Sequence, residues 1–361
     1  MARYEKRLQE DLTHIRGQVR ILGDMVEKVL NDAVHALLNR NVSLANETVL
    51  ADHPINRQMR EIDRICHGFI ARHLPSAGHL RMISSIIRLN IALERVGDYA
   101  VTISREALQL KAPMEEMIQR EVESLADESR QILHQALDAF HGGSAEAARS
   151  VMQLPGHLET TLNGVYSNLI GGEYTRDSGD LFAISVILTQ LKRVADQSKN
   201  ICEEALFATT GETKTKKVYS VLFVDRDNRS LSPMAEAIAA NSHPNSGRYT
   251  SGGGSPGGEI DSALVNFMEQ RGMDLSALRP KGLDYSSGEL AGFHVIVSLQ
   301  GAATDYFSQI PFHTTYLEWD LGVPPEGLDE VEVKQRYEEI YRELSYRIQD
   351  LMELLRGEGA D

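Results

Sequence analysis

Apolar residues recur at steps of three and four through most of the first 210 residues, a spacing that places them along one face of an α-helix. Breaks rich in Pro, Gly, Asn and Ser separate these stripes. We expect helices over residues 19–37, 55–73, 79–108, 115–140, 144–152, 157–171 and 180–207. The first two-thirds of the chain is therefore predicted to be all-α.

These helices form two sets of about three, divided near Pro113. Residues 91–98 read IALERVGD and residues 189–196 read TQLKRVAD, each in the last long helix of its set. A duplicated three-helix bundle is the most economical account of this repeat. We expect the first bundle to span residues 1–110 and the second to span residues 114–212.

The pattern changes after residues 211–217, a short polar and basic stretch that we interpret as a linker. A β-branched and aromatic run at 218–224 is typical of a buried strand, and a helix is expected to begin at Ser232 and Pro233. The glycine-rich residues 252–258 are expected to form a flexible connection. Further strands are expected at 293–299 and 313–318, and further helices at 259–272, 301–308 and 328–356. This alternation predicts an α/β domain with a parallel sheet over 218–361.

Charge and hydropathy narrow the class of protein. The formal net charge is −15, and −12 of it lies in residues 218–361. A surface of this sign repels nucleic acid and acidic membranes. No apolar run approaches the ~18–20 residues that a membrane span needs, and the N-terminal sequence has no apolar signal segment. Because there are only two cysteines, no disulfide framework is expected, and we predict a cytoplasmic protein.

Glu94 and Asp98 lie four residues apart, so their carboxylates share one face of a helix whose other residues are mostly apolar. Like charges at this spacing repel each other, and partial burial increases the cost. A cation with oxygen ligands or a neighbouring arginine would offset the repulsion. The alternative is a solvated helix face with no ligand. In the second copy Lys192 replaces the glutamate, which predicts a plain ion pair between Lys192 and Asp196.

The segments LERVGDYAVTI and LKRVADQSKNICEEALFATTGE resemble the two signature helices of the PhoU family, and the stretch from Asp52 to LPSAGHLRMISSIIRLNIALERVGD resembles the first PhoU repeat. The resemblance covers about residues 1–212. It implies two three-helix bundles, a homodimer, and a non-enzymatic role between a phosphate ABC transporter and a phosphate-sensing histidine kinase. It also implies a divalent or iron-type metal bound through Glu/Asp-x-x-x-Asp motifs. These motifs carry over onto Glu94 and Asp98, and in the second copy onto Asp196 alone.

Residues 221–237 read VLFVDRDNRSLSPMAEA, which indicates a strand, a tight polar loop and the start of a helix. The backbone N–H groups of such a loop and the positive end of the helix form a cradle for an anion. The frame resembles low-molecular-weight protein tyrosine phosphatases and arsenate reductases, over about residues 218–355. The predicted residues of this degenerate anion loop are Asp225, Asn228, Arg229, Ser230 and Ser232.

The catalytic residues that the phosphatase resemblance implies are absent. Asp225 stands at the position of the family's cysteine, Leu231 at that of its arginine, and Val323 at that of its general-acid aspartate. The reaction needs a thiolate nucleophile, a guanidinium on the phosphoryl oxygens and a proton donor for the leaving oxygen. No cysteine follows Cys202 that could substitute. We therefore expect a pseudophosphatase; the alternative is a divergent metal-dependent phosphatase that uses Asp225 and Asp227.

These features together predict a multidomain fold, in which an all-α pair of PhoU-like bundles precedes an α/β phosphatase-like domain. The function predicted is a negative regulator of phosphate uptake and phosphate signalling with no catalytic residues. Its C-terminal domain would dock a partner or sense an anion. A scaffold that binds no ligand at either site is a third hypothesis.

Overall fold

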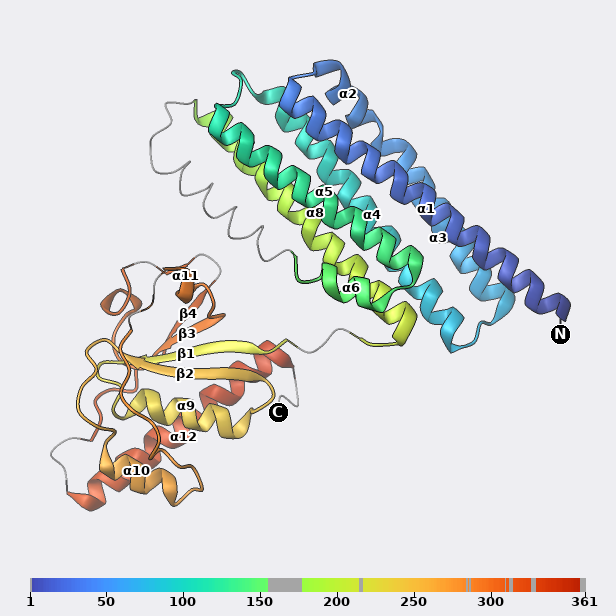
Figure 1. The fold of residues 1–361 in the computed structure, drawn as a ribbon. Helices are drawn as coiled ribbons and strands as arrows, with labels where there is room; N and C mark the ends of the chain where they lie inside the picture. The colour runs from blue at the N-terminus through green and yellow to red at the C-terminus, as the bar shows by residue number, and fades with distance from the viewer. Residues whose placement is uncertain are drawn as a thin grey trace. The chain divides into compact units, whose positions relative to one another are not determined.

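The computed structural model describes residues 2–154, 177–213, 217–283, 285, 287–308, 310–311, 314–325 and 329–357. The chain divides into two compact units, Met1–Lys214 and Thr215–Asp361. Long helices make up the first unit, and a sheet with flanking helices makes up the second (Figure 1). The predicted order of an all-α part followed by an α/β part is confirmed.

The described helices of the first unit are α1 (Ala2–Asn39), α2 (Val42–Leu50), α3 (Asp52–His73), α4 (Ala77–Gln109), α5 (Glu116–Gly142), α6 (Ala145–Val151) and α8 (Ser178–Thr210). Helix α1 begins well before the expected residue 19, because buried Leu8, Leu12 and Ile15 extend its apolar stripe. The short helix α2 was not expected; the side chain of Asn41 caps it by accepting the N–H of Leu44. The helix expected at 157–171 lies outside the described residues.

One hydrophobic core runs through α1, α3, α4, α5, α6 and α8. Helices α4 and α8, which carry the two copies of the repeated segment, pack against each other along their lengths. Fully buried Leu93 and Val96 on α4, with Leu191 and Val194 on α8, belong to this core. Burying such a side chain stabilises the fold by about 1.5–3 kcal/mol. Because both sets of helices share the core, the boundary between the bundles at 110–114 stays a prediction.

The sheet of the second unit is parallel throughout and has the strand order β2-β1-β3-β4. Its strands are β1 (Tyr219–Asp225), β2 (Gly247–Gly253), β3 (Val295–Ser298) and β4 (Thr315–Glu318). The helices are α9 (Leu231–Ser242), α10 (Ser262–Glu269), α11 (Ser287–Leu290) and α12 (Glu330–Arg356), with a 3-10 turn at Ala303–Asp305. The parallel sheet and the strands at 218–224, 293–299 and 313–318 are confirmed, each with shifted ends.

Two expectations for this unit were wrong. Strand β2 was not predicted, and it takes in Gly252 and Gly253, which were expected to belong to a flexible connection. Gly253 lies here because a Cβ at this position would stand 2.6 Å from the backbone nitrogen of Asn228, so only glycine lets β2 approach the loop after β1. The helix expected at 301–308 is only the short 3-10 turn. The helix expected at 259–272 is confirmed as α10, which is shorter at both ends.

The sheet has one core on each face, because successive side chains of a strand point to opposite sides. Val221 and Phe223 of β1 enter the core under α9, α10 and α12, whereas Leu222 and Val224 enter a smaller core next to α11. Trp319, the only tryptophan of the chain, is buried in the larger core, with its ring centroid 6.3 Å from that of Phe223. Both cores leave the carboxyl end of β1 free to carry a polar loop.

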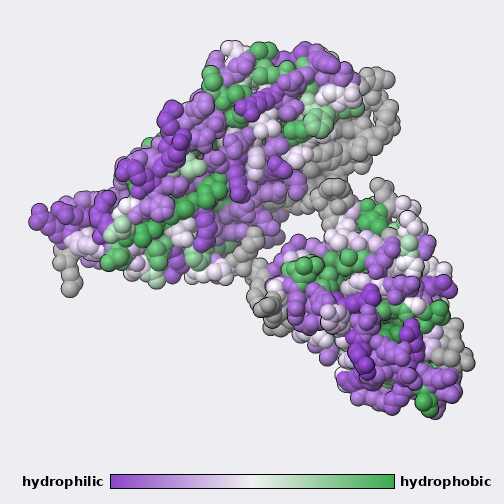
Figure 2. All heavy atoms as spheres, turned by 180° about the vertical axis from the view of Figure 1, so that it is seen from behind, coloured by the Kyte–Doolittle hydropathy of each residue, from purple (hydrophilic) through white to green (hydrophobic). Residues whose placement is uncertain are grey.

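Hydrophilic side chains cover most of the face of both units that Figure 2 shows, with smaller hydrophobic groups between them. Among the described helices, none has an apolar stretch long enough to cross a membrane. The most exposed apolar side chains include Phe182 and Leu354. Single exposed side chains of this kind are common on folded proteins and do not by themselves mark a binding surface.

Candidate functional site

The loop between β1 and α9 lies at the carboxyl edge of the parallel sheet, where open α/β folds bind ligands. Asp225 ends β1, and its side chain is only 1 % exposed. Its Oδ1 atom accepts the backbone N–H of Asn228 at 2.6 Å, and its Oδ2 atom accepts that of Ser232 at 2.8 Å. The carboxylate of the chain itself therefore occupies N–H donors that such a loop would offer to an anion.

Asn228 fixes the shape of this loop. Its φ of 55° lies in the left-handed region, which asparagine tolerates better than most residues. Its side-chain oxygen accepts the N–H of Lys281 at 2.7 Å, and its amide nitrogen donates to the Oγ atom of Ser232 at 2.8 Å. Because the side chain is fully buried, these bonds hold the loop against the neighbouring segment and against the first turn of α9.

The two arginines of the loop do not stand at the position where the phosphatase resemblance expects an arginine. The Nε atom of Arg229 donates to the carbonyl oxygen of Glu259 at 2.9 Å, and its backbone N–H donates to Asp227. Arg226 is exposed, and its backbone N–H donates to the side chain of Gln300. Leu231, at the position where the phosphatase resemblance expects arginine, is fully buried in the larger core.

The structure brings the predicted anion-loop residues together in one turn. Asp225, Asn228, Ser230 and Ser232 are all buried. Burial raises the pKa of Asp225 to about 6, while hydrogen bonds from Ser232 and Asn228 oppose the shift. Near neutral pH the group is therefore mostly ionised, and its charge repels any anion that approaches the loop.

A second cluster of acidic groups lies between α3 and α4. Burial raises the pKa of Glu94, and the charges of Asp98 and Asp52 raise it further. Burial and the charge of Asp52 also raise the pKa of Asp98. Helices α3 and α4 approach closely here, since a Cβ on Gly97 would lie 3.3 Å from Ile55. Two predicted metal ligands and a third carboxylate are therefore close enough to repel one another.

Asp52 is the member of this cluster that the sequence analysis missed. Its Oδ2 atom accepts from Asn56 at 2.8 Å, whereas its Oδ1 atom is buried with no hydrogen-bond partner. A buried oxygen without a partner is costly, and a cation is one group that would satisfy it. Asp52 is the first residue of the segment that resembles the first PhoU repeat. That resemblance was the feature of the sequence that could have pointed to Asp52.

The fit of a metal ion to this cluster is partial. Carboxylate oxygens are suitable donors for a hard cation. However, no three His, Cys, Asp or Glu side chains among the described residues are arranged to hold a metal ion. Asp196 lies on α8, where the Nζ atom of Lys192 donates to its carboxylate at 3.5 Å, as the sequence predicted. The metal-binding role of Glu94, Asp98 and Asp196 stays a prediction.

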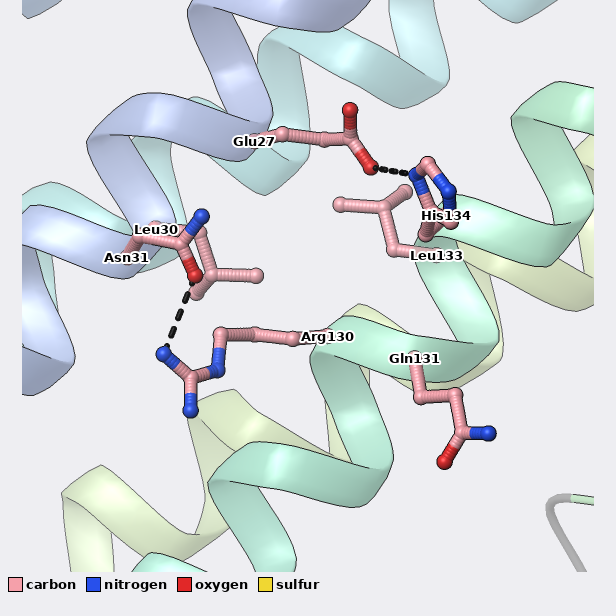
Figure 3. A pocket seen from close by; sticks show the side chains of 7 residues that line it. All are labelled: Glu27, Leu30, Asn31, Arg130, Gln131, Leu133 and His134. Carbon is pink, nitrogen blue, oxygen red and sulfur yellow. Dashed lines mark hydrogen bonds and ion pairs between the residues drawn. The ribbon is translucent and has the colours of Figure 1, made fainter.

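A cleft of about 320 Å³ lies between α1 and α5, which belong to different predicted bundles (Figure 3). The Oε1 atom of Glu27 lies 2.8 Å from the Nδ1 atom of His134, and Arg130 donates to the side chain of Asn31 at 3.0 Å. The hydrogen bond to Glu27 raises the pKa of His134. These polar groups bind one another across the seam, so we interpret them as a link between the two sets of helices.

Comparison with known proteins assigns the first unit. The sequence model of the PhoU domain matches residues 19–107 and 122–205. The phosphate-specific transport system accessory protein PhoU homolog of Pseudomonas putida is 34% identical over 211 residues, which are 56% of this chain and 80% of that protein. The chain belongs to the PhoU family. The resemblance found in the sequence is thus confirmed for this unit.

Solved PhoU structures support the same assignment. The crystal structure of PhoU from Pseudomonas aeruginosa is 31% identical with a TM-score of 0.55, and the match covers 56% of this chain and 99% of that one. PhoU from Streptococcus pneumoniae is 26% identical with a TM-score of 0.54. This match covers 57% of this chain and 98% of that one. The second unit, Thr215–Asp361, lies wholly beyond the PhoU match.

The second unit of this PhoU protein matches the sequence model of low molecular weight phosphotyrosine protein phosphatases over residues 220–360. The resemblance that the sequence analysis found for this part is confirmed. The match includes the loop after β1, which contains Asp225. Loss of catalysis in this unit stays a prediction.

Proposed function

We propose that this PhoU protein is a negative regulator of phosphate uptake and phosphate signalling, and that its C-terminal unit is a pseudophosphatase. Its curated relatives are accessory proteins of phosphate-specific transport, which supports an accessory role in phosphate transport here. The partners proposed are a phosphate ABC transporter and a phosphate-sensing histidine kinase, reached by a homodimer in the cytoplasm. The helical unit supplies this role.

The loss of catalysis is supported above all by the hydrogen bonds of Asp225. Both carboxylate oxygens accept N–H groups of their own loop, at 2.6 and 2.8 Å, which fixes the carboxylate within the loop and weakens it as a nucleophile toward phosphorus. The side chain is buried, and its negative charge opposes the approach of a phosphate ester. Leu231 provides no guanidinium to hold phosphoryl oxygens. Partner docking therefore suits this unit better than anion sensing.

Turnover of a chromogenic aryl phosphate by the full chain, with and without Mg²⁺, tests this proposal. We expect no turnover above that of buffer in either condition. The alternative, a metal-dependent phosphatase that uses Asp225 and Asp227, requires activity that depends on Mg²⁺ and disappears in Asp225→Asn. Such a result would refute the pseudophosphatase proposal, provided that an exposed control variant on α12, Asp350→Asn, keeps the activity.

The regulatory role has a separate test in cells. In a bacterium that lacks its own PhoU, we expect the full chain to lower expression from a phosphate-starvation promoter when phosphate is plentiful. The variant Asp225→Asn should repress as well as the wild type if catalysis has no part in the role. Absence of repression by the wild-type chain, at an expression level confirmed by blotting, would contradict the proposed regulation.

We further propose that the Glu94 and Asp98 pair on α4 binds a divalent cation, with water as its remaining ligands. The raised pKa values of both carboxyl groups, to which the charge of Asp52 contributes, support the proposal. Metal analysis of protein purified without chelator or metal resin tests the proposal. We expect about one metal per chain, lost in Glu94→Gln/Asp98→Asn and kept in Asp196→Asn. A metal-free wild type would instead favour a solvated pair of carboxylates.

A further inference from the structure

A second cleft on the helical unit, of about 240 Å³, lies where α1, α4 and α5 meet. Its charged lining consists of two arginines and a histidine, and its floor is apolar. The lining residues that matter are Arg16, Arg20 and His141, over Val19, Ile86 and Phe140. The floor side chains are buried, so the charged groups stand at the rim of a low-dielectric surface.

Neither guanidinium in this cleft forms an ion pair with a described residue. Among the described residues, no carboxylate oxygen lies within ion-pair distance of Arg16 or Arg20, and the polar contact of Arg16 is to the sulfur of Met82 at 3.7 Å. By contrast, Arg72 and Arg130, on other parts of the same unit, each bind an aspartate. Two arginines one helical turn apart, neither in an ion pair with a described residue, can both donate to one tetrahedral oxyanion.

The charges of Arg16 and Arg20 both act on the ring of His141. Burial lowers its pKa, and the charges of Arg20 and Arg16 lower it further, so both arginines lie near its ring. Asp24 on α1 and Asp138 on α5 act in the opposite direction. An anion held between the arginines would reverse the effect of the two guanidiniums and let protonated His141 serve as a third donor.

Gly17 lines the cleft from within α1, where glycine is less favourable than alanine. No close packing requires it, because a Cβ at this position would meet no atom within 4 Å. Its missing side chain instead leaves space beside Arg16 and Arg20 at the cleft wall.

We propose that this cleft binds a tetrahedral oxyanion of the phosphate class, held by Arg16 and Arg20 with His141 as a third donor. The two guanidiniums supply charge and fork-shaped donors, the apolar floor strengthens the attraction, and Gly17 leaves room for the ligand. The site lies in the helical unit and does not use the loop at Asp225. The test of this cleft therefore gives a result that does not depend on the regulatory role proposed above.

Calorimetric titration of the full chain with inorganic phosphate, at constant ionic strength against chloride, tests the proposal. We expect saturable binding by the wild type and at least about tenfold weaker binding by Arg16→Gln/Arg20→Gln, because each variant side chain loses a charge-assisted contact. Gly17→Leu, which keeps every charge but fills the cleft, should weaken binding to a similar extent. Arg7→Gln removes an exposed positive charge from α1 outside the cleft and should bind as the wild type does.

Absence of saturable binding by the wild type would overturn the proposal, as would equal binding by the wild type and the double variant. Equal losses in Arg7→Gln and the double variant would also overturn it, since the effect would then be one of net charge. Helix content measured by circular dichroism checks that each variant is folded. Gly17→Leu tests the same site by shape alone, so one unfolded variant would not decide the outcome.

The role of His141 is tested with sulfate, whose charge does not change between about pH 6 and 8. Sulfate should bind more tightly at the lower pH, because protonated His141 then adds a donor. His141→Gln should remove most of this pH dependence while keeping binding at pH 8. A pH dependence that is the same in the wild type and in His141→Gln would remove His141 from the site.

Discussion

The buried carboxylate of Asp225 should make the stability of the second unit fall as the pH rises. Burial raises its pKa to about 6 in the folded protein, from an ordinary value of 3.8 for a solvated aspartate. Between these two values the folded state binds the proton that the unfolded state has released, so the free energy of unfolding decreases with increasing pH. At about 1.4 kcal/mol per unit, the full effect is about 3 kcal/mol, of which about 2 kcal/mol falls between pH 4.5 and 7.5.

Urea unfolding followed by tryptophan fluorescence measures this effect in the full chain. Trp319 is the only tryptophan and is buried in the larger core of the second unit, so its emission reports the unfolding of that unit. Between pH 4.5 and 7.5 the wild type should lose about 2 kcal/mol more than Asp225→Asn, whose side chain does not titrate. With an m-value of about 2 kcal/mol/M, this corresponds to a difference of roughly 1 M in the shift of the urea midpoint.

In the comparison of the wild type with Asp225→Asn, the contributions of all shared titrating groups to the pH dependence cancel. Asp350→Asn, an exposed aspartate on α12, is the matched control and should follow the wild type at each pH. If the wild type and Asp225→Asn change in parallel with pH, the carboxylate does not pay a burial cost. The hydrogen bonds from Asn228 and Ser232 would then fully offset desolvation, and the argument for a proton held at this site would be refuted.

Two further predictions concern packing and the seam between the helix sets. Gly253→Ala should destabilise the second unit by about 1–3 kcal/mol in the Trp319 assay, because its Cβ would lie 2.6 Å from a backbone nitrogen of the loop; Gly257→Ala, in open space, should change little. Glu27→Gln should lower the pKa of His134, measured by NMR titration, because the hydrogen bond to Glu27 raises it. Since the folded pKa is raised, the stabilisation by this pair is present at low pH and is lost as the pH rises through that pKa; an unchanged His134 titration would contradict this account.

Much of the fold could be predicted from local patterns. The helices of the first unit are amphipathic over many turns, and the β-branched and aromatic run at 218–224 is typical of a buried strand. Strand β2 escaped prediction because GRYTSGG lacks a β-branched pattern and owes its conformation to pairing with β1. The helix expected at 301–308 failed because Gly301 adopts a φ of +72° and only one short turn follows.

The sequence identified most residues of the candidate sites, but it did not reveal which of them contact one another. The sequence identified Asp225 and the loop residues, yet nothing in it revealed that the carboxylate accepts N–H groups of its own loop. Likewise Glu94 and Asp98 follow from helical spacing, whereas Asp52 joins them only because α3 packs against α4. Contacts between separate elements depend on packing, which a single sequence does not display.

The core shared by α4 and α8 limits which positions of the two repeat copies can differ in sequence. Because each copy buries its last long helix against that of the other, a truncation near Pro113 would expose a large apolar face, and the two copies should unfold in one cooperative transition. Apolar positions of both copies are thus held under the same stability constraint. Polar positions outside the core are not, so a lysine at position 192, paired with Asp196, is compatible with the same architecture.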